Sequence, residues 1–167
     1  MKGITLIGMP GAGKSTIGKK LADSLGWKFL DLDILIQEKT GLAPAEFIGK
    51  NGDTAFLELE EELSLDLNLA ETVFAPGGSI IYSTRAMNKL KSETQIFYLD
   101  LPLEEVKKRL GPKPLERGII GLARWGLEGL FTERHYLYQT YAHQTISFSD
   151  AGDQDVIEQI KKIVFLA

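Results

Sequence analysis

The residues best suited to chemistry lie directly after the first apolar run of the chain, residues 4–7. Residues 8–16 read Gly-Met-Pro-Gly-Ala-Gly-Lys-Ser-Thr and match the pattern GxxxxGK followed by Ser or Thr at every position. Glycines keep Cβ atoms out of such a loop, so successive backbone N–H groups can point inward and surround the phosphates of a nucleotide. The residues expected to bind the nucleotide here are Gly11, Ala12, Gly13, Lys14, Ser15 and Thr16.

Lys14 and Ser15 have distinct expected roles in this loop. The Lys14 ammonium can reach the β and γ phosphates of a nucleoside triphosphate, and the Ser15 hydroxyl can bind Mg²⁺. The apolar spacing of Ile17, Leu21 and Leu25 predicts a helix that begins near Lys14 and directs the positive end of its dipole at the same anion. A glycine-rich turn without a ligand is the alternative, but strand, loop and helix all agree with phosphate binding. The dinucleotide pattern GxGxxG fails because its third glycine is missing.

Two aspartates follow the second predicted strand, residues 27–31. The carboxyl ends of parallel strands form the edge of a sheet where ligands bind, and the phosphate loop lies at the same edge. We expect Asp31 to hold Mg²⁺ through water, and Asp33 to accept or orient the proton of an attacking hydroxyl. Alternatively, Asp33 only caps the helix that begins there.

A third predicted strand, residues 72–75, ends in a loop without bulky side chains, Gly77-Gly78-Ser79. Adjacent glycines after a strand can form a simple turn. Three strand ends that carry either glycines or carboxylates in one small domain favour a binding site instead.

Residues 111–118 are rich in glycine, proline and cations. Such a stretch between two helices predicts a mobile lid, about residues 111–126, that can bring Lys113 or Arg117 over a phosphate. A plain surface connection is the alternative.

Strand-like segments alternate with helical ones along the chain, which predicts an α/β fold with three layers, α/β/α, and a five-stranded, mainly parallel sheet. Residues from about 33 to 69 predict a helical insertion over the site, broken at residues 49–52, where a second substrate binds. A later helix over residues 127–141 carries Arg134. The predicted strands are residues 4–7, 27–31, 72–75, 95–99 and 144–148.

The composition predicts one ordinary globular domain, residues 1–167. Hydrophobic residues make up 44% and charged residues 25% of the chain, whose length suits one core. The net charge of -4 argues against nucleic-acid binding, which depends on basic patches. The absence of cysteine excludes a disulfide framework, and no apolar run is long enough for a signal peptide or a membrane span. We therefore expect a cytoplasmic monomer that binds neither membranes nor nucleic acid.

A triphosphate bound by this loop can serve phosphoryl transfer, a hydrolytic switch or a motor. Switches and motors normally need partner surfaces and a longer chain. The helical insertion and the cationic lid favour transfer between two substrates, because water must be excluded while the γ-phosphate moves. The second substrate is then a small molecule that accepts the phosphate.

The whole chain resembles the shikimate kinases, which share the P-loop fold of the nucleoside monophosphate kinases. This resemblance implies a kinase that uses ATP and Mg²⁺ to phosphorylate a hydroxyl of shikimate, giving shikimate 3-phosphate and ADP in aromatic amino acid biosynthesis. The matching motifs are the phosphate loop 8–16, the DxD of Asp31 and Asp33, the GGG-type loop at 77–79, Lys113-Pro114-Leu115 in place of the family's lid pattern R-P-L, and the late R-x-x-x-Y from Arg134 to Tyr138.

The resemblance also implies roles for single residues. The planar guanidinium of Arg109 would pack against adenine, and Lys113 or Arg117 would sense the phosphates from the lid. The implied acceptor contacts are Asp33 with the hydroxyls, Gly77 and Gly78 through backbone N–H groups, and Arg134 with the carboxylate.

Leu57 is the main departure from the family pattern. Residues 56–60 correspond to a family motif F-R-x-x-E, whose arginine helps to bind the acceptor's carboxylate. A charge-assisted hydrogen bond contributes about 1.5 to 3 kcal/mol, so its loss should weaken acceptor binding by about one to two powers of ten unless another cation substitutes. Glu60 then lacks the arginine as its partner. Ser79 in place of glycine and Lys113 in place of arginine are smaller departures.

Leu57 leaves two alternatives open beside a shikimate kinase. The first is a kinase of the same fold that acts on another small polyol or hydroxy acid. The second is a nucleotide-binding regulatory domain without transfer activity. The presence of Lys14, Ser15, Asp31 and Asp33 argues against the second.

Overall fold

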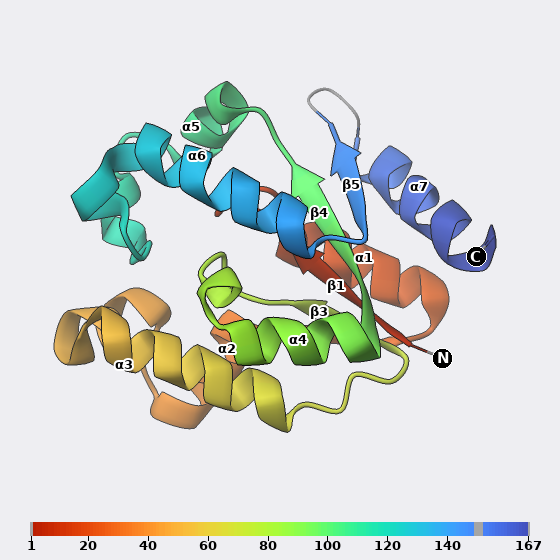
Figure 1. The fold of residues 1–167 in the computed structure, drawn as a ribbon, viewed down its shortest axis with the longest axis horizontal. Coiled ribbons are helices and arrows are strands. Elements are labelled where there is room, and N and C mark those ends of the chain that lie inside the picture. The colour runs from red at the N-terminus through yellow and green to blue at the C-terminus, as the bar shows by residue number, and fades with distance from the viewer. Residues whose placement is uncertain (1, 149–151, 167) are drawn as a thin grey trace.

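A computed structural model describes residues 2–148 and 152–166 and contains one five-stranded sheet with the strand order β2-β3-β1-β4-β5 (Figure 1). Each neighbouring pair of strands is parallel, so the α/β prediction is confirmed and the sheet is parallel throughout the described residues. The strands are β1 (Gly3–Ile7), β2 (Lys28–Asp31), β3 (Thr72–Ala75), β4 (Thr94–Asp100) and β5 (Gln144–Ser147).

Helices cover both faces of this sheet, which gives the three layers expected from the sequence (Figure 1). The helices α1 and α7 contact each other on one face, while α4 and α6 contact β4 from the other. The helix bounds are α1 Lys14–Leu25, α2 Leu32–Thr40, α3 Pro44–Asp66, α4 Thr84–Glu93, α5 Leu103–Leu110, α6 Leu122–Tyr141 and α7 Asp153–Leu166, with short 3₁₀ helices η1 at Ile80–Tyr82 and η2 at Pro114–Arg117.

The core lies along the central strands, because parallel strands covered on both faces bury side chains in both directions. All five residues of β1 and all four residues of β3 are buried. This burial on both faces explains why both strands are mainly apolar. The packing also fixes the positions of the carboxyl ends of β1 and β3.

The strand order places three chain segments of the predicted site next to one another. The strands β2, β3 and β1 are neighbours, and Asp31 at the end of β2 is in register with Ala75 at the end of β3. The phosphate loop follows β1 at the same edge. Segments far apart in the sequence therefore meet at the carboxyl edge of the sheet, as expected for an open parallel sheet.

The predicted break in the helical insertion is confirmed at Gly52, where a φ of 83° interrupts α3. The prediction that Asp33 caps the next helix is wrong. Helix α2 begins at Leu32, and its N-cap is Asp31, whose side chain accepts a hydrogen bond from the backbone N–H of Asp33. The later helix also begins earlier than predicted, at Leu122, because its first turn precedes a kink at Gly126.

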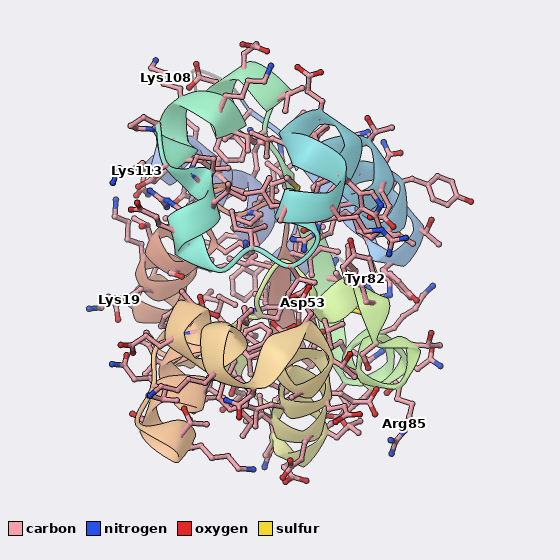
Figure 2. All side chains as sticks on the ribbon, turned by 90° about the vertical axis from the view of Figure 1, so that its left-hand side faces the viewer. Lys19, Asp53, Tyr82, Arg85, Lys108 and Lys113 are labelled. Carbon is pink, nitrogen blue, oxygen red and sulfur yellow. The ribbon has the colours of Figure 1, made fainter. Side chains whose placement is uncertain are left out.

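Residues 111–121 connect α5 to α6, and their short helix η2 contacts α3; in Figure 2 this segment lies above α3. The contact is close at Gly118, since a Cβ there would lie 2.5 Å from the Cα of Ala45 at the start of α3. The lid segment therefore rests on the helical insertion in this structure. Across residues 2–148 and 152–166, every helix is too short or too polar to cross a membrane.

Candidate active site

One cavity of about 610 Å³ lies at the carboxyl edge of the sheet, between the phosphate loop, the insertion and the lid. This volume is in the range of small-molecule sites. Its wall contains most of the residues singled out in the sequence, including Gly11, Gly13, Lys14, Ser15, Thr16, Asp31, Asp33, Gly77, Gly78, Arg109, Arg117 and Arg134.

The phosphate loop adopts a conformation that requires glycine at two positions. Gly11 and Gly13 have φ values of 83° and 92°, which lie in the left-handed region that side chains with a Cβ rarely adopt. Gly13 is the N-cap of α1 and makes no side-chain hydrogen bond to the first turn. The N–H groups at the start of α1 are therefore available to bind an anion.

The Lys14 side chain folds back into this loop. Its Nζ donates hydrogen bonds to the carbonyl oxygens of Gly8 and Met9, at 2.9 and 3.1 Å. Burial lowers the pKa of Lys14 from 10.5 to about 8, although the nearby Asp33 carboxylate opposes this shift. A bound triphosphate would favour the charged ammonium and offer stronger acceptors than these carbonyls.

Ser15 and Asp31 form the candidate magnesium site. The Ser15 hydroxyl donates a hydrogen bond to Asp31 Oδ2 at 2.5 Å, so a hydroxyl oxygen and a carboxylate oxygen are already together. Mg²⁺ prefers oxygen ligands, keeps several waters and is often held by one or two protein groups plus the phosphates of the substrate. The donor set thus fits Mg²⁺, and no cluster of three or more histidine or acidic side chains suited to a metal occurs in the described part of the chain.

Asp33 lines the same cavity from the first turn of α2. Burial by the surrounding wall raises the pKa of the Asp33 carboxyl, the neighbouring Asp31 raises it further, and Lys14 opposes both. A carboxylate of raised pKa is a better proton acceptor than an ordinary aspartate.

The loop after β3 is held by helix α6. Tyr138 donates its hydroxyl proton to the carbonyl oxygen of Gly78 at 2.8 Å, and Arg134 lies one turn earlier on the same face. A Cβ at Gly78 would lie 2.8 Å from Arg134 Nη1 and 3.1 Å from Tyr138 Oη. A larger residue at this position would therefore displace Arg134 or Tyr138.

Arg134 is almost completely buried, with 1% of its surface exposed. Its Nη2 donates to the carbonyl oxygen of Ile120 at 2.8 Å, and its Nε donates to the hydroxyl of Tyr82 at 3.3 Å. The guanidinium also lies over the Tyr82 ring, 5.4 Å from its centre. These contacts fix the guanidinium, and its Nη1 lies beside Gly78 in the cavity wall.

The two candidate lid cations occupy different places. Arg117 lines the cavity, whereas Lys113 is outside its wall, has a side chain that is 72% exposed, and pairs with Glu116 at 2.8 Å. Figure 2 shows Lys113 at the outer edge of the lid. The geometry favours Arg117 over Lys113.

Arg109 lies beside the phosphate loop, at the end of α5. Its guanidinium is 5.8 Å from the centre of the Phe148 ring, and its Nη1 donates to the Gly11 carbonyl oxygen at 3.4 Å. A planar cation in this position is suited to stacking against a base.

Sequence reasoning missed the contacts that Glu60, Ser79, Tyr82 and Ile120 make. Ser79 donates its hydroxyl proton to Glu60 Oε2 at 2.6 Å, and Glu60 lines the cavity. The change from the family's glycine to serine at position 79 was the available signal for this contact. No pattern signalled the roles of Tyr82 and Ile120, because both depend on where α6 packs.

Comparisons with known proteins give one consistent result. A family model described as shikimate kinase matches residues 10–164. The chain is 34% identical over 162 residues to a shikimate kinase of Enterococcus faecalis, with 96% of each chain covered. It also resembles the solved shikimate kinases of Acinetobacter baumannii, in complex with shikimate (30% identity, TM-score 0.86, 99% of this chain and 93% of that chain covered), and of Aquifex aeolicus (27%, 0.75, 95% and 93%).

Proposed function

The chain belongs to the shikimate kinase family, and on that premise we propose that it transfers the γ-phosphate of ATP to a hydroxyl of shikimate. It is an ATP-dependent kinase that acts on an alcohol group, and its family uses Mg²⁺. The products of the proposed reaction are shikimate 3-phosphate and ADP.

One structural observation supports the proposed reaction independently of family membership. A single cavity is lined by a phosphate loop with Lys14 and also by Asp33 and Arg134. The first set suits a triphosphate, and the second suits a small molecule that has both hydroxyl and carboxylate groups. The arrangement therefore supports direct transfer between two bound substrates.

On the donor side, the N–H groups of the loop and the first turn of α1 bind the phosphates. Lys14 moves its ammonium from the carbonyls of Gly8 and Met9 to the β and γ phosphates. Arg109 packs against the adenine. Ser15 and Asp31 would hold Mg²⁺, which neutralises charge on the phosphates when bound.

On the acceptor side, Asp33 orients the reacting hydroxyl and takes its proton. The hydroxyl oxygen forms a bond to the γ-phosphorus, the bond from that phosphorus to the bridging oxygen of ADP breaks, and the proton goes to Asp33. Arg134 binds the acceptor's carboxylate through Nη1, and Gly77 and Gly78 contribute backbone N–H groups.

The lid completes the donor side. We assign its phosphate-sensing cation to Arg117, because this side chain lines the cavity while Lys113 pairs with Glu116 at the surface. Closure of the lid over both substrates excludes water, which would otherwise compete as the acceptor.

We further propose that the chain acts as a cytoplasmic monomer and binds no nucleic acid. The proposed reaction consumes ATP, which is available in the cytoplasm. The net charge of -4 is unfavourable for contact with a phosphate backbone. Light scattering of the purified protein should give a mass near 18.5 kDa.

ADP release tests the proposed reaction directly. The assay contains ATP and Mg²⁺, with shikimate varied to high concentration beside quinate, gluconate and a nucleoside monophosphate. Saturable release with shikimate alone is expected, and the comparisons do not favour the two alternative functions. Release with gluconate or quinate but not with shikimate would contradict the proposal, as would nucleotide binding without release for any acceptor.

A further inference from the structure

Glu60 is a buried acid in the cavity wall beside Gly77, and the proposed reaction does not use it. It lies on α3, is 1% exposed, and accepts one hydrogen bond, from Ser79 to Oε2 at 2.6 Å. Its other oxygen, Oε1, has no hydrogen-bond partner among the described residues. A carboxylate oxygen buried without a partner is costly, so this atom needs an explanation.

Oε1 points to the loop that we assign to the acceptor. A Cβ added at Gly77 would clash with Glu60 Oε1 and would lie 3.7 Å from Asp33 Oδ1. Glu60 from α3 and Asp33 from α2 therefore approach the same point of the cavity wall. An acceptor molecule bound at Gly77 would lie within reach of both carboxyl groups.

Four charged or titratable groups surround Glu60 besides the Ser79 hydroxyl. Asp33 and Tyr138 face it as an acid and a phenol, while Arg134 and Lys14 face it as cations. Burial raises the pKa of Glu60 from 4.5 to about 7; the Ser79 hydrogen bond opposes this shift and Asp33 adds to it. A substantial fraction of the molecules thus carries a neutral Glu60 at neutral pH.

Because position 57 is leucine, α3 provides no cation at this position to stabilise the charged form of Glu60. Leu57 lies three residues before Glu60 on α3, and the two residues line a smaller cavity of about 180 Å³ behind the acceptor site. A cation at position 57 would stabilise the charged form of Glu60, but leucine cannot. Ser79 supplies a neutral hydrogen bond in place of an ion pair.

We propose that Glu60 is a specificity-determining residue that binds the acceptor in its neutral form. Because the Ser79 proton occupies Oε2, the acid proton is on Oε1, where it can be donated to an oxygen of the acceptor. A charged Glu60 instead repels an acceptor carboxylate held by Arg134. This inference rests on the proposed function in one respect, namely that the acceptor is a hydroxy acid.

Steady-state kinetics with shikimate between pH 6 and 9, at saturating ATP and Mg²⁺, test the role of Glu60. For a neutral form lost near pH 7, the KM for shikimate should rise about tenfold from pH 6 to pH 8. Glu60→Gln should abolish this rise. Ser79→Ala should move it to higher pH, because it removes the bond that favours the charged acid. Glu58→Gln, an exposed change on the same helix, should behave as the unmodified protein.

A second measurement keeps the proposal testable without turnover. The ¹³C carboxyl resonance of Glu60, identified by its absence in Glu60→Gln, should titrate near pH 7 in the ligand-free protein. Titration in the ordinary range below pH 5 would overturn the inference, and so would a normal turnover whose KM does not depend on pH. Titration near pH 7 with no turnover of shikimate would reject the proposed function while supporting the neutral state of Glu60.

Discussion

Ser15 donates its hydroxyl proton to Asp31, with 2.5 Å between Oγ and Oδ2, and thereby joins the first turn of α1 to the end of β2. Asp31 also accepts a hydrogen bond from the backbone N–H of Asp33 at 3.0 Å. One carboxylate thus caps α2 and joins it to α1, and it is also the ligand that we propose for Mg²⁺.

The first prediction concerns the Mg²⁺ role of Asp31. Asp31→Asn keeps a side-chain oxygen that can cap α2, so the thermal unfolding temperature should change little. It removes a charged oxygen ligand, and the Mg²⁺ concentration needed for half-maximal ADP release should rise roughly tenfold or more. A titration of Mg²⁺ at fixed ATP measures this effect. An unchanged Mg²⁺ requirement would remove Asp31 from the metal site.

The second prediction separates donor binding from proton transfer. Asp33→Asn should lower kcat by about 10² to 10⁴, because the amide cannot accept the hydroxyl proton, while ATP binding measured by calorimetry stays close to normal. Lys14→Ala should abolish most turnover and also weaken ATP binding. A nearly normal rate for Asp33→Asn would exclude it as the proton acceptor.

The third prediction compares the two cations of the lid. Arg117→Ala should lower kcat by about tenfold or more, because it removes the guanidinium that lines the cavity, whereas Lys113→Ala should change kcat less than twofold. Both changes remove one positive charge, so each controls for the other in the ADP-release assay. The reverse order of effects would assign the role to Lys113.

Local patterns predicted the phosphate loop, because its chemistry depends on glycines and a lysine at fixed spacing within nine residues. The strand ends could also be placed, since parallel strands direct their carboxyl ends to one edge. The choice between Arg117 and Lys113 could not be predicted, because it depends on how η2 packs against α3.

Two further features were also beyond sequence reasoning. The N-cap of α2 is Asp31 and not Asp33. The backbone geometry sets the first residue of a helix, and the sequence offers two nearby aspartates that could cap it. The pairing of Ser79 with Glu60 joins residues 19 positions apart on different elements. The substitutions at positions 57 and 79 are each visible in the sequence, but their connection through Glu60 requires the packing of α3 against the loop after β3.

The fourth prediction concerns the arginine that remains for the acceptor's carboxylate. Arg134→Lys retains the positive charge but loses the fork that donates to Ile120, Tyr82 and the cavity at once. The KM for shikimate should rise about 10- to 100-fold with a smaller change in kcat. Because Arg134 is buried, the variant should also unfold at a lower temperature. An unchanged KM would place the carboxylate elsewhere in the cavity.

The last prediction uses stability to measure the ionisation of Glu60. Its pKa is raised from 4.5 to about 7 in the folded protein, so its stabilising effect is complete below pH 4.5 and is lost as the pH rises through 7. This linkage should cost the ligand-free protein about 2 to 3 kcal/mol between pH 5 and pH 8. Glu60→Gln lacks the ionisation and should lose less stability than the unmodified protein over this range.

Urea unfolding of both proteins at pH 5 and pH 8 measures the difference between their losses of stability. The contributions of the ionisable groups that both proteins share cancel in this difference. Glu62→Gln is the matched control, because Glu62 is an exposed acid two residues further along α3 that pairs with Lys39 at the surface. It should leave the pH dependence as in the unmodified protein. If Glu60→Gln loses as much stability between pH 5 and pH 8 as the unmodified protein, Glu60 is charged throughout this range. The Ser79 hydrogen bond, Arg134 and Lys14 are then sufficient to stabilise a buried carboxylate in the cavity.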